Sequence, residues 1–217
     1  MRVAVIGGGP SGLVTLKYLV SAHEFFPIEA IEARLFEAAA KVGGIFFHHT
    51  YEDAELVSSK YLTTFSDFPP RPDDPDFLPA DRYLEYLNEY ATHFGLWDHI
   101  HLLTTVKGIR RSDGGGHVVT YKTSSGDLVD WECDALAVCS GLHDVPNIPD
   151  LKGVEHVPVV MHSSSFKSSQ QFGVDKTVMI LGSGETSFDI CSMAMQAPTK
   201  KVVLGHRHGW LGAPRVR

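Results

Sequence analysis

Short apolar runs alternate with glycine-rich turns and helical patterns in the first forty residues. Residues 3–6 form a continuous apolar run, as in parallel strands that are covered on both faces. A glycine-rich turn follows at residues 7–12, and mainly apolar positions then recur at helical spacing, at Leu13, Leu16, Lys17 and Val20. A second strand is expected over residues 33–36 and ends at Glu37. This order predicts a strand, a glycine turn, a helix and a second strand, which together make one βαβ unit.

The middle of the chain predicts a helix and a set of antiparallel strands. Four prolines exclude regular structure over residues 68–75. A helix is expected from Pro79, because one apolar stripe follows it at Tyr83, Leu84, Leu87, Tyr90, Ala91 and Phe94. Strand-like segments near residues 100–109, 116–123 and 128–139 are separated by turns rich in glycine and serine, which predicts a small antiparallel meander.

The opening pattern returns after a linker that contains three prolines. A strand over residues 178–181 leads into a glycine turn at 182–187, and residues 201–204 form the next strand. Between them a helical face is expected at Phe188, Cys191 and Met195. The chain therefore contains two dinucleotide-type βαβ starts. We expect one domain over residues 1–150 and a second, incomplete domain over residues 151–217.

The first glycine turn has the spacing of a phosphate-binding loop. In Gly7-x-Gly9-x-x-Gly12, the first glycine permits a sharp turn and the second lets the backbone approach a pyrophosphate. The third lets the helix pack on the strand. Pro10-Ser11 opens the helix, whose N-terminal N–H groups attract phosphate. Glu37 ends the next strand, where a carboxylate accepts hydrogen bonds from ribose hydroxyls.

The second glycine turn is a weaker form of the same motif, Gly182-x-Gly184-x-x-Ser187. About 20 residues on, where an NAD site places an acid, the chain has His206-Arg207-His208. Arg207 can bind a 2′-phosphate through charge-assisted hydrogen bonds, so NADPH is expected rather than NADH. The alternative is that Arg207 is a solvated surface cation. One site that ends in an acid and one that ends in bases suggest FAD followed by NADPH, with hydride transfer between them.

Composition narrows the partners. The net charge of −7 argues against nucleic acid and anionic membranes, which are normally met by basic faces. Three cysteines without a CxxC pair indicate neither a redox disulfide nor a zinc ribbon, and they suit a reducing compartment. Histidine pairs such as His48-His49 lack the Cys or carboxylate partners of a tetrahedral site, so no metal is expected. A strand from residue 2 and the absence of a long apolar run predict a cytoplasmic chain without a signal peptide or membrane segment.

These motifs resemble the flavin-containing monooxygenase family. Residues 7–12 resemble its FAD loop, and residues 36–46 resemble its Phe-Glu…Gly-Gly-Leu-Trp segment. Residues 58–69 are similar to its Ser-Lys…Phe-Ser-Asp-Phe-Pro run, and residues 139–149 to its crossover into the NADPH domain. The resemblance implies an α/β fold: a Rossmann-like FAD-binding domain with a parallel sheet and an antiparallel meander, then the start of a second Rossmann-like, NADPH-binding domain.

The resemblance also implies an NADPH-dependent flavoprotein monooxygenase, which passes one oxygen atom from O2 to a nitrogen or sulfur centre of a small molecule. It places Phe46 near the flavin and Thr105-Val106 by the adenine of FAD. No side chain stands out as a catalytic base. The residues expected to bind the two cofactors are Gly7, Gly9, Pro10, Ser11, Gly12, Glu37, Gly44, Ile45, Phe46, Ser58, Val106, Gly141, Gly182, Gly184, Thr186, Ser187 and Arg207.

Three departures from the family pattern leave alternatives open. In the stretch Phe-x-Gly-x-x-x-His-x-x-x-(Phe/Tyr), His162 and Phe166 match, but His156 and Pro158 replace the first two fixed positions. Val57 stands where many members have an Asn beside the flavin, which puts amine oxygenation of the usual kind in doubt. The chain also stops early in the second Rossmann unit, as a truncated product, a fragment or one part of a split protein would. The alternatives are an inactive FAD-binding remnant and a Baeyer–Villiger oxygenase, a group that prefers Trp at the position of Phe166.

Overall fold

The computed structural model describes residues 1–142, 145–207 and 209, and the chain forms two compact units. Unit 1 contains Met1–His49 and Ser59–Val145, and unit 2 contains Thr50–Ser58 and Pro146–Arg217. A short excursion of the chain, segment 50–58, therefore belongs to the second unit although unit 1 surrounds it in sequence. Nothing in the aperiodic pattern of residues 38–66 indicates this exchange.

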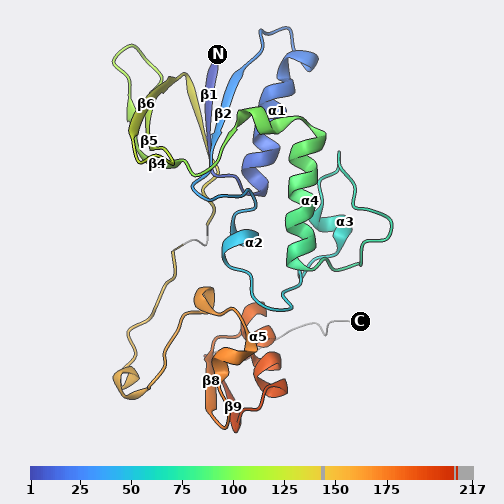
Figure 1. Cartoon of the computed structure of the whole chain (residues 1–217), viewed down its shortest axis with the longest axis vertical. Helices are drawn as coiled ribbons and strands as arrows, with labels where there is room; N and C mark the ends of the chain where they lie inside the picture. Colours follow the sequence, from blue (N-terminus) through green and yellow to red (C-terminus); the bar gives the residue numbers. More distant parts are fainter. Residues whose placement is uncertain (143–144, 208, 210–217) are drawn as a thin grey trace. The chain divides into compact units, whose positions relative to one another are not determined.

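A four-stranded parallel sheet lies at the centre of unit 1 (Figure 1). Strand β1 (Arg2–Ile6) pairs with a neighbouring strand on each side, and helix α1 (Pro10–Phe25) contacts the same sheet. Because β1 is covered in this way, its residues Val3, Ala4 and Val5 are buried. This burial explains the continuous apolar run at the start of the chain. The strand order is β3-β2-β1-β7, and the bounds of these elements are Ile100–His101, Glu32–Phe36, Arg2–Ile6 and Ala135–Val138 for the strands and Pro10–Phe25 for α1.

Three antiparallel strands form the expected meander in the order β4 (Thr105–Arg111), β5 (His117–Lys122) and β6 (Leu128–Cys133). Its apolar face packs on the parallel sheet through a buried cluster of Ala4, Phe36, Val119, Trp131 and Cys133. Two of the expected strand segments are each divided between the two sheets. The chain turns at Leu103, whose φ is +52°, between β3 and β4, and at Asp134, whose backbone N–H and carboxylate both bond to Arg2, between β6 and β7.

Helix α4 (Ala80–His93) carries the expected aromatic stripe. Tyr83, Leu87, Tyr90 and Ala91 are buried as the pattern indicates, and Tyr86 joins them. The Tyr86 hydroxyl accepts the N–H of Phe65 and donates to the carbonyl oxygen of Phe68, both at 2.7 Å. These bonds fix the proline-containing loop against α4. The other short helices of unit 1 are α2 (Ile45–His48), α3 (Lys60–Thr63) and the 3-10 helix η1 (Leu96–His99).

A buried charge cluster holds the same loop from its other end. Lys60 is buried, and its ammonium group donates to the backbone carbonyl oxygen of Asp74. The Asp74 carboxylate accepts the N–H of Arg71 at 2.8 Å and the Nε–H of Arg82 at 2.6 Å. Burial of the Asp74 carboxylate is tolerated because Arg82 pairs with it, and burial of Lys60 because backbone carbonyl oxygens accept its N–H bonds.

Unit 2 contains one parallel pair of strands, β8 (Thr177–Leu181) and β9 (Lys201–Gly205), joined by helix α5 (Glu185–Gln196). The helix expected between these strands is confirmed, and of its expected face Phe188 and Cys191 are half-buried but Met195 is not covered. Ile190 and Ala194 are the buried residues, whereas Met195 is 72% exposed. Among the described residues only two strands lie beneath α5, so only a narrow stripe of the helix is covered. The 3-10 helices η2 to η4 precede β8, at Val154–His156, Ser163–Ser165 and Ser169–Phe172.

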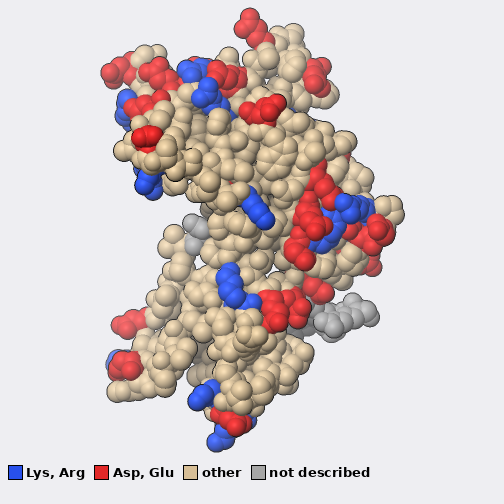
Figure 2. All heavy atoms as spheres, viewed as in Figure 1, with Lys and Arg blue, Asp and Glu red and all other residues tan. Residues whose placement is uncertain are grey.

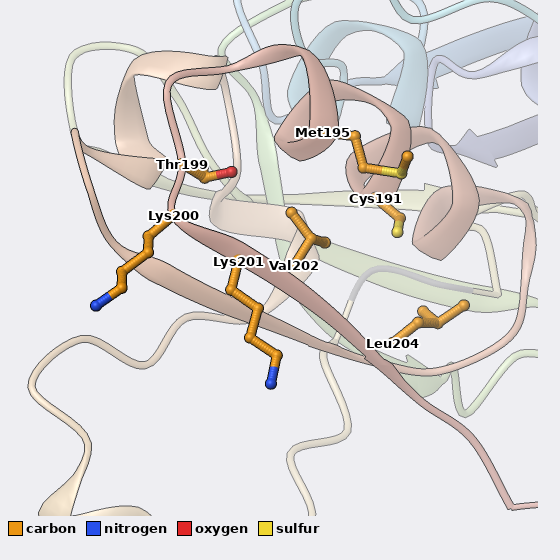
Figure 3. Close-up of a pocket in the computed structure, with 7 residues that line it drawn as sticks. All are labelled: Cys191, Met195, Thr199, Lys200, Lys201, Val202 and Leu204. Atoms are coloured by element: carbon orange, nitrogen blue, oxygen red, sulfur yellow. The ribbon is translucent and has the colours of Figure 1, made fainter.

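A shallow hollow of about 420 Å³ lies between the later turns of α5 and strand β9. Figure 3 shows Cys191 and Met195 of the helix and Val202 and Leu204 of the strand at this hollow, while the ammonium groups of the two lysines, at positions 200 and 201, point away from it. Cys191 lies seven residues after the N-cap of α5. The hollow is therefore about 10 Å along the helix from its glycine turn.

Candidate functional site

The first glycine turn joins β1 to α1, and two of its glycines are required by the packing of the protein itself. Gly7 has a φ of +106°, and a Cβ there would lie 2.4 Å from the carbonyl oxygen of Cys139. A Cβ on Gly12 would lie 1.8 Å from the carbonyl oxygen of Gly7. A side chain at position 7 would displace the segment that follows β7, and one at position 12 would force the helix away from the turn. The packing of the protein therefore accounts for glycine at these two positions, without reference to a ligand.

Gly9 is different, because the protein leaves room beside it. Its φ is −76°, which any residue can adopt, and it is the N-cap of α1. A Cβ on Gly9 would meet only Gly44, whose Cα would lie 3.7 Å away, an ordinary contact. A glycine at this position is what a close approach between the backbone and a pyrophosphate requires. Ser11 lies exposed in the first turn of the helix, where N–H groups have no intrahelical acceptor.

A second pair of glycines lies against the first turn. The N–H of Gly43 donates to the carbonyl oxygen of Gly8 at 2.8 Å. A Cβ on Gly44, where φ is +58°, would lie 3.2 Å from the Cα of Gly9. Ile45 and Phe46 then open α2, and the Phe46 ring packs edge-on against Tyr83 at 4.7 Å between centroids. The fold thus brings the predicted residues Gly44, Ile45 and Phe46 beside the first turn.

Glu37 follows directly after β2, and its carboxylate is bonded to the first turn. Its side chain is 6% exposed, and its two carboxylate oxygens accept the N–H of Gly8 at 2.6 Å and the N–H of Ala39 at 2.7 Å. Each oxygen keeps a further lone pair for a ligand hydroxyl. A hollow of about 350 Å³ is lined by Ala38, which follows Glu37 in the chain, by Leu103 and Thr105, and by the turn at residues 122–126.

The second glycine turn also has one glycine that the protein's own packing crowds and one that has room beside it. Gly182 has a φ of +138°, and a Cβ there would lie 2.8 Å from Oγ of Ser187, which leaves little room. Gly184 is the N-cap of α5, and a Cβ on it would meet no described atom within 4 Å. Thr186 is exposed in the first turn of the helix. Glu185 also lies in that turn, so its carboxylate adds a negative charge that α1 lacks.

Arg207 lies close to this turn in the chain topology. The N–H of Gly182 donates to the carbonyl oxygen of Gly205, the last residue of β9, at 2.9 Å. Arg207 follows two residues later and is exposed. Its neighbour His206 accepts the N–H of Gly209 through Nδ1 at 2.9 Å, and His208 lies outside the described residues. Arg207 is thus an exposed cation two residues beyond the strand end that is bonded to the glycine turn.

Three of the predicted residues lie in other segments of the chain than the two turns. Ser58 is half-buried and belongs to unit 2, as the last residue of segment 50–58. Gly141 is exposed after β7, with a φ of +83°. Val106 packs at the border of the buried cluster between the two sheets. Sequence reasoning missed Gly8 and Ala39, whose N–H groups hold Glu37, because backbone donors carry no residue signature.

On the face drawn in Figure 2, Lys and Arg side chains lie among Asp and Glu side chains rather than in one continuous basic area. No group of three His, Cys, Asp or Glu side chains with the geometry of a metal site occurs in the part of the chain that the structure describes. No helix over the same residues is long and apolar enough to cross a membrane.

Two glycine turns, each between a parallel strand and a helix, together with a buried carboxylate at the end of the next strand, define a dinucleotide-binding α/β protein. The family model for flavin-binding monooxygenase-like proteins matches residues 1–216. The chain belongs to this family. The resemblance seen in the sequence is thereby confirmed, together with the α/β fold class.

Among its relatives, the chain is 60% identical over 210 residues to "Monooxygenase cfoE" of Aspergillus candidus, a match that covers 97% of this chain and 36% of that protein. It is 33% identical over 225 residues to "Dimethylaniline monooxygenase (N-oxide-forming) 2" of Pan troglodytes, over 96% of this chain and 40% of that protein. The chain thus spans little more than a third of the length of these curated relatives.

Solved structures share the fold over almost the whole chain. The S-allyl-L-cysteine S-oxygenase of Allium sativum superposes with a TM-score of 0.85 at 23% identity, over 100% of this chain and 53% of that one. The structure of OTEMO in complex with FAD and NADP gives a TM-score of 0.69 at 22% identity, over 94% of this chain and 38% of that one. At this identity the likeness concerns the fold.

Proposed function

We propose that the chain is the nucleotide-binding part of an FAD- and NADPH-dependent monooxygenase, with FAD at the first glycine turn and NADPH at the second. The observation that carries the proposal is the open middle glycine of each turn, Gly9 and Gly184, where the protein leaves room that a pyrophosphate would use. The strand ends beyond the two turns differ in charge, with Glu37 at one and Arg207 at the other. The names of the relatives support an oxygenase, and OTEMO binds FAD and NADP together.

The residues at the first turn fit FAD. The backbone of residues 7–12 and the start of α1 would hold the pyrophosphate, and Glu37 would hold ribose hydroxyls with its free lone pairs. Residues 44–46 would lie toward the flavin, and Thr105-Val106 toward the adenine. When bound, the flavin supplies hydride acceptance from the nicotinamide and activation of O2. The side chains of this chain bind and orient the cofactor and shield it from water, and none of them is assigned a proton transfer.

The second turn would hold NADPH through the backbone near Gly182 and Gly184, the first turn of α5 with Thr186 and Ser187, and the Arg207 guanidinium on the 2′-phosphate. The substrate class in the proposal is a small molecule with a nitrogen or sulfur nucleophile, oxidised with O2. One relative is named as N-oxide-forming, and one structural neighbour is named as an S-oxygenase. A cytoplasmic location is part of the proposal, supported by the three free cysteines.

The test is the visible absorbance spectrum of the purified chain in air-free buffer, before and after addition of NADPH. A flavin spectrum that is bleached by NADPH but not by NADH would support both sites and the hydride step. A protein that stays colourless with added FAD would reject the proposal for this chain and favour a remnant without flavin. A flavin spectrum that no nicotinamide bleaches would retain the first site and reject the second.

A further inference from the structure

Segment 50–58 is held in unit 2 by contacts that the proposed function leaves without a role. The Glu52 carboxylate accepts the backbone N–H of Ser169 at 3.0 Å and its hydroxyl at 2.9 Å. These bonds lower the pKa of the Glu52 carboxyl. The N–H of Glu52 donates to the carbonyl oxygen of Lys167 at 2.8 Å, and Nζ of Lys167 donates to the carbonyl oxygen of Thr50 at 3.1 Å. The beginning of the segment is therefore fixed to the loop that carries η4.

Tyr51 extends this attachment to helix α5. Its hydroxyl donates to Oδ2 of Asp189 at 2.8 Å. Its ring lies 5.8 Å from the ring of Phe166, which is 2% exposed and stacks on Phe172 at 5.1 Å. A hydroxyl that donates to a carboxylate makes a charge-assisted bond, which is stronger and more directional than a neutral one. Tyr51 is therefore held both by its ring and by its hydroxyl.

The position of Asp189 gives this contact its meaning. Asp189 lies five residues after Gly184, on the helix whose N-terminus is the second glycine turn. Within one or two turns a helix is stiff, so an anion that orders its first turn also orders Asp189. Segment 50–58 ends with Val57 and Ser58, and the chain re-enters unit 1 at Ser59.

We propose that Tyr51 is a positioning residue, whose hydroxyl bond to Asp189 couples occupancy of the second glycine turn by a nicotinamide dinucleotide to the order of segment 50–58. The proposal rests on the NADPH site proposed above and adds to it a mechanical link that uses side chains of this chain only. By linkage, the nucleotide stabilises the Tyr51 contact as much as the contact favours the nucleotide.

The test compares Tyr51→Phe, which keeps the ring and removes the hydroxyl, with Tyr61→Phe, which removes a hydroxyl from a tyrosine of unit 1 that is 73% exposed. Amide hydrogen exchange of a peptide spanning residues 50–58 is measured in the whole chain, without and with saturating NADP⁺. Loss of a hydrogen bond to a charged group corresponds to roughly tenfold faster exchange of this peptide in Tyr51→Phe without ligand. In the wild type NADP⁺ slows the exchange of this peptide. In Tyr51→Phe the factor by which NADP⁺ slows the exchange should be at least about threefold smaller.

The expected result includes an unchanged flavin spectrum in both variants and wild-type exchange in Tyr61→Phe. Equal slowing by NADP⁺ in the wild type and in Tyr51→Phe would overturn the coupling. The coupling would also be overturned if NADP⁺ raises the thermal midpoint of the wild type but leaves the exchange of residues 50–58 unchanged. A wild-type chain whose thermal midpoint does not respond to NADP⁺ overturns the proposed NADPH site itself, and the coupling falls with it.

Discussion

Replacement of Gly9 and of Gly12 by alanine separates glycines that the ligand requires from glycines that the fold requires. At Gly12 the new Cβ would lie 1.8 Å from the carbonyl oxygen of Gly7, so β1 and α1 must move apart. Such overpacking in a buried turn costs about 3 kcal/mol or more. At Gly9 the new Cβ would find its nearest neighbour, Cα of Gly44, at 3.7 Å. Only the weaker N-cap preference of alanine opposes it, at about 1 kcal/mol or less.

At Gly9 the substitution should cost little stability but should weaken the binding of FAD. A methyl group between the backbone and the pyrophosphate removes at least one charge-assisted hydrogen bond, which corresponds to about 1.5–3 kcal/mol. FAD should therefore bind Gly9→Ala about ten to a hundred times more weakly. Ligand at about 100 times the dissociation constant stabilises the wild type by about 2.7 kcal/mol, and this stabilisation falls to roughly 0.4 kcal/mol if the affinity drops a hundredfold.

The assay is thermal unfolding with and without added FAD. For a chain of this size, about 2.7 kcal/mol corresponds to a rise of roughly 5–10 °C in the midpoint, against about 1 °C for Gly9→Ala. Gly12→Ala should unfold at a lower temperature even without FAD. A Gly9→Ala protein with the full FAD-dependent shift would refute the inference that the room beside Gly9 is ligand space. A Gly12→Ala protein as stable as the wild type would refute the packing argument.

Three further changes test other parts of the structure. Gly184→Ala should leave the flavin spectrum intact and raise the NADPH concentration for half-maximal anaerobic bleaching about tenfold, and an unchanged concentration would contradict the site. Arg207→Ala should weaken NADPH about tenfold and leave NADH unchanged, so an unaltered ratio of the two affinities would make Arg207 a surface cation. Asp74→Asn should lower the free energy of unfolding in urea by about 3 kcal/mol at pH 7, because it leaves Arg82 with a weakened partner. Burial alone would raise the pKa of Asp74, but hydrogen bonds from Arg82 and from the N–H of Arg71 lower it. Its stabilising effect is therefore present above about pH 4 and is lost as the pH falls through the folded-state pKa, so the difference between Asp74→Asn and the wild type should narrow there.

The elements predicted well from the sequence are those whose burial pattern is set by near neighbours in the chain. β1 is covered on both faces and reads as a continuous apolar run, and α4 buries one aromatic stripe at helical spacing. The glycines at positions 7 and 12 also follow from the motif, because the strand–turn–helix geometry that demands them is local.

The features that escaped prediction depend on contacts between distant segments. Met195 fits an apolar stripe of α5 but lies exposed, because the cover of that helix is decided by which strands lie beneath it. Lys60 and Asp74 look like surface charges in a polar, aperiodic stretch, and become buried only when their loop packs on α4. Segment 50–58 has no signal of its own, because its partners lie more than a hundred residues away in the chain.

The discontinuous make-up of unit 2 has a consequence for how the chain folds. Tyr51 and Asp189 are 138 residues apart in sequence, and Glu52 and Ser169 are 117 apart. Closure of such long loops is entropically costly and slow, so these contacts form late. During synthesis residues 50–58 emerge long before Ser169 and Asp189, so these bonds cannot form until those two residues have been made. A polypeptide that starts at residue 146 would lack both Tyr51 and Glu52, so the second unit is not a module that can be cut out of the chain and moved intact.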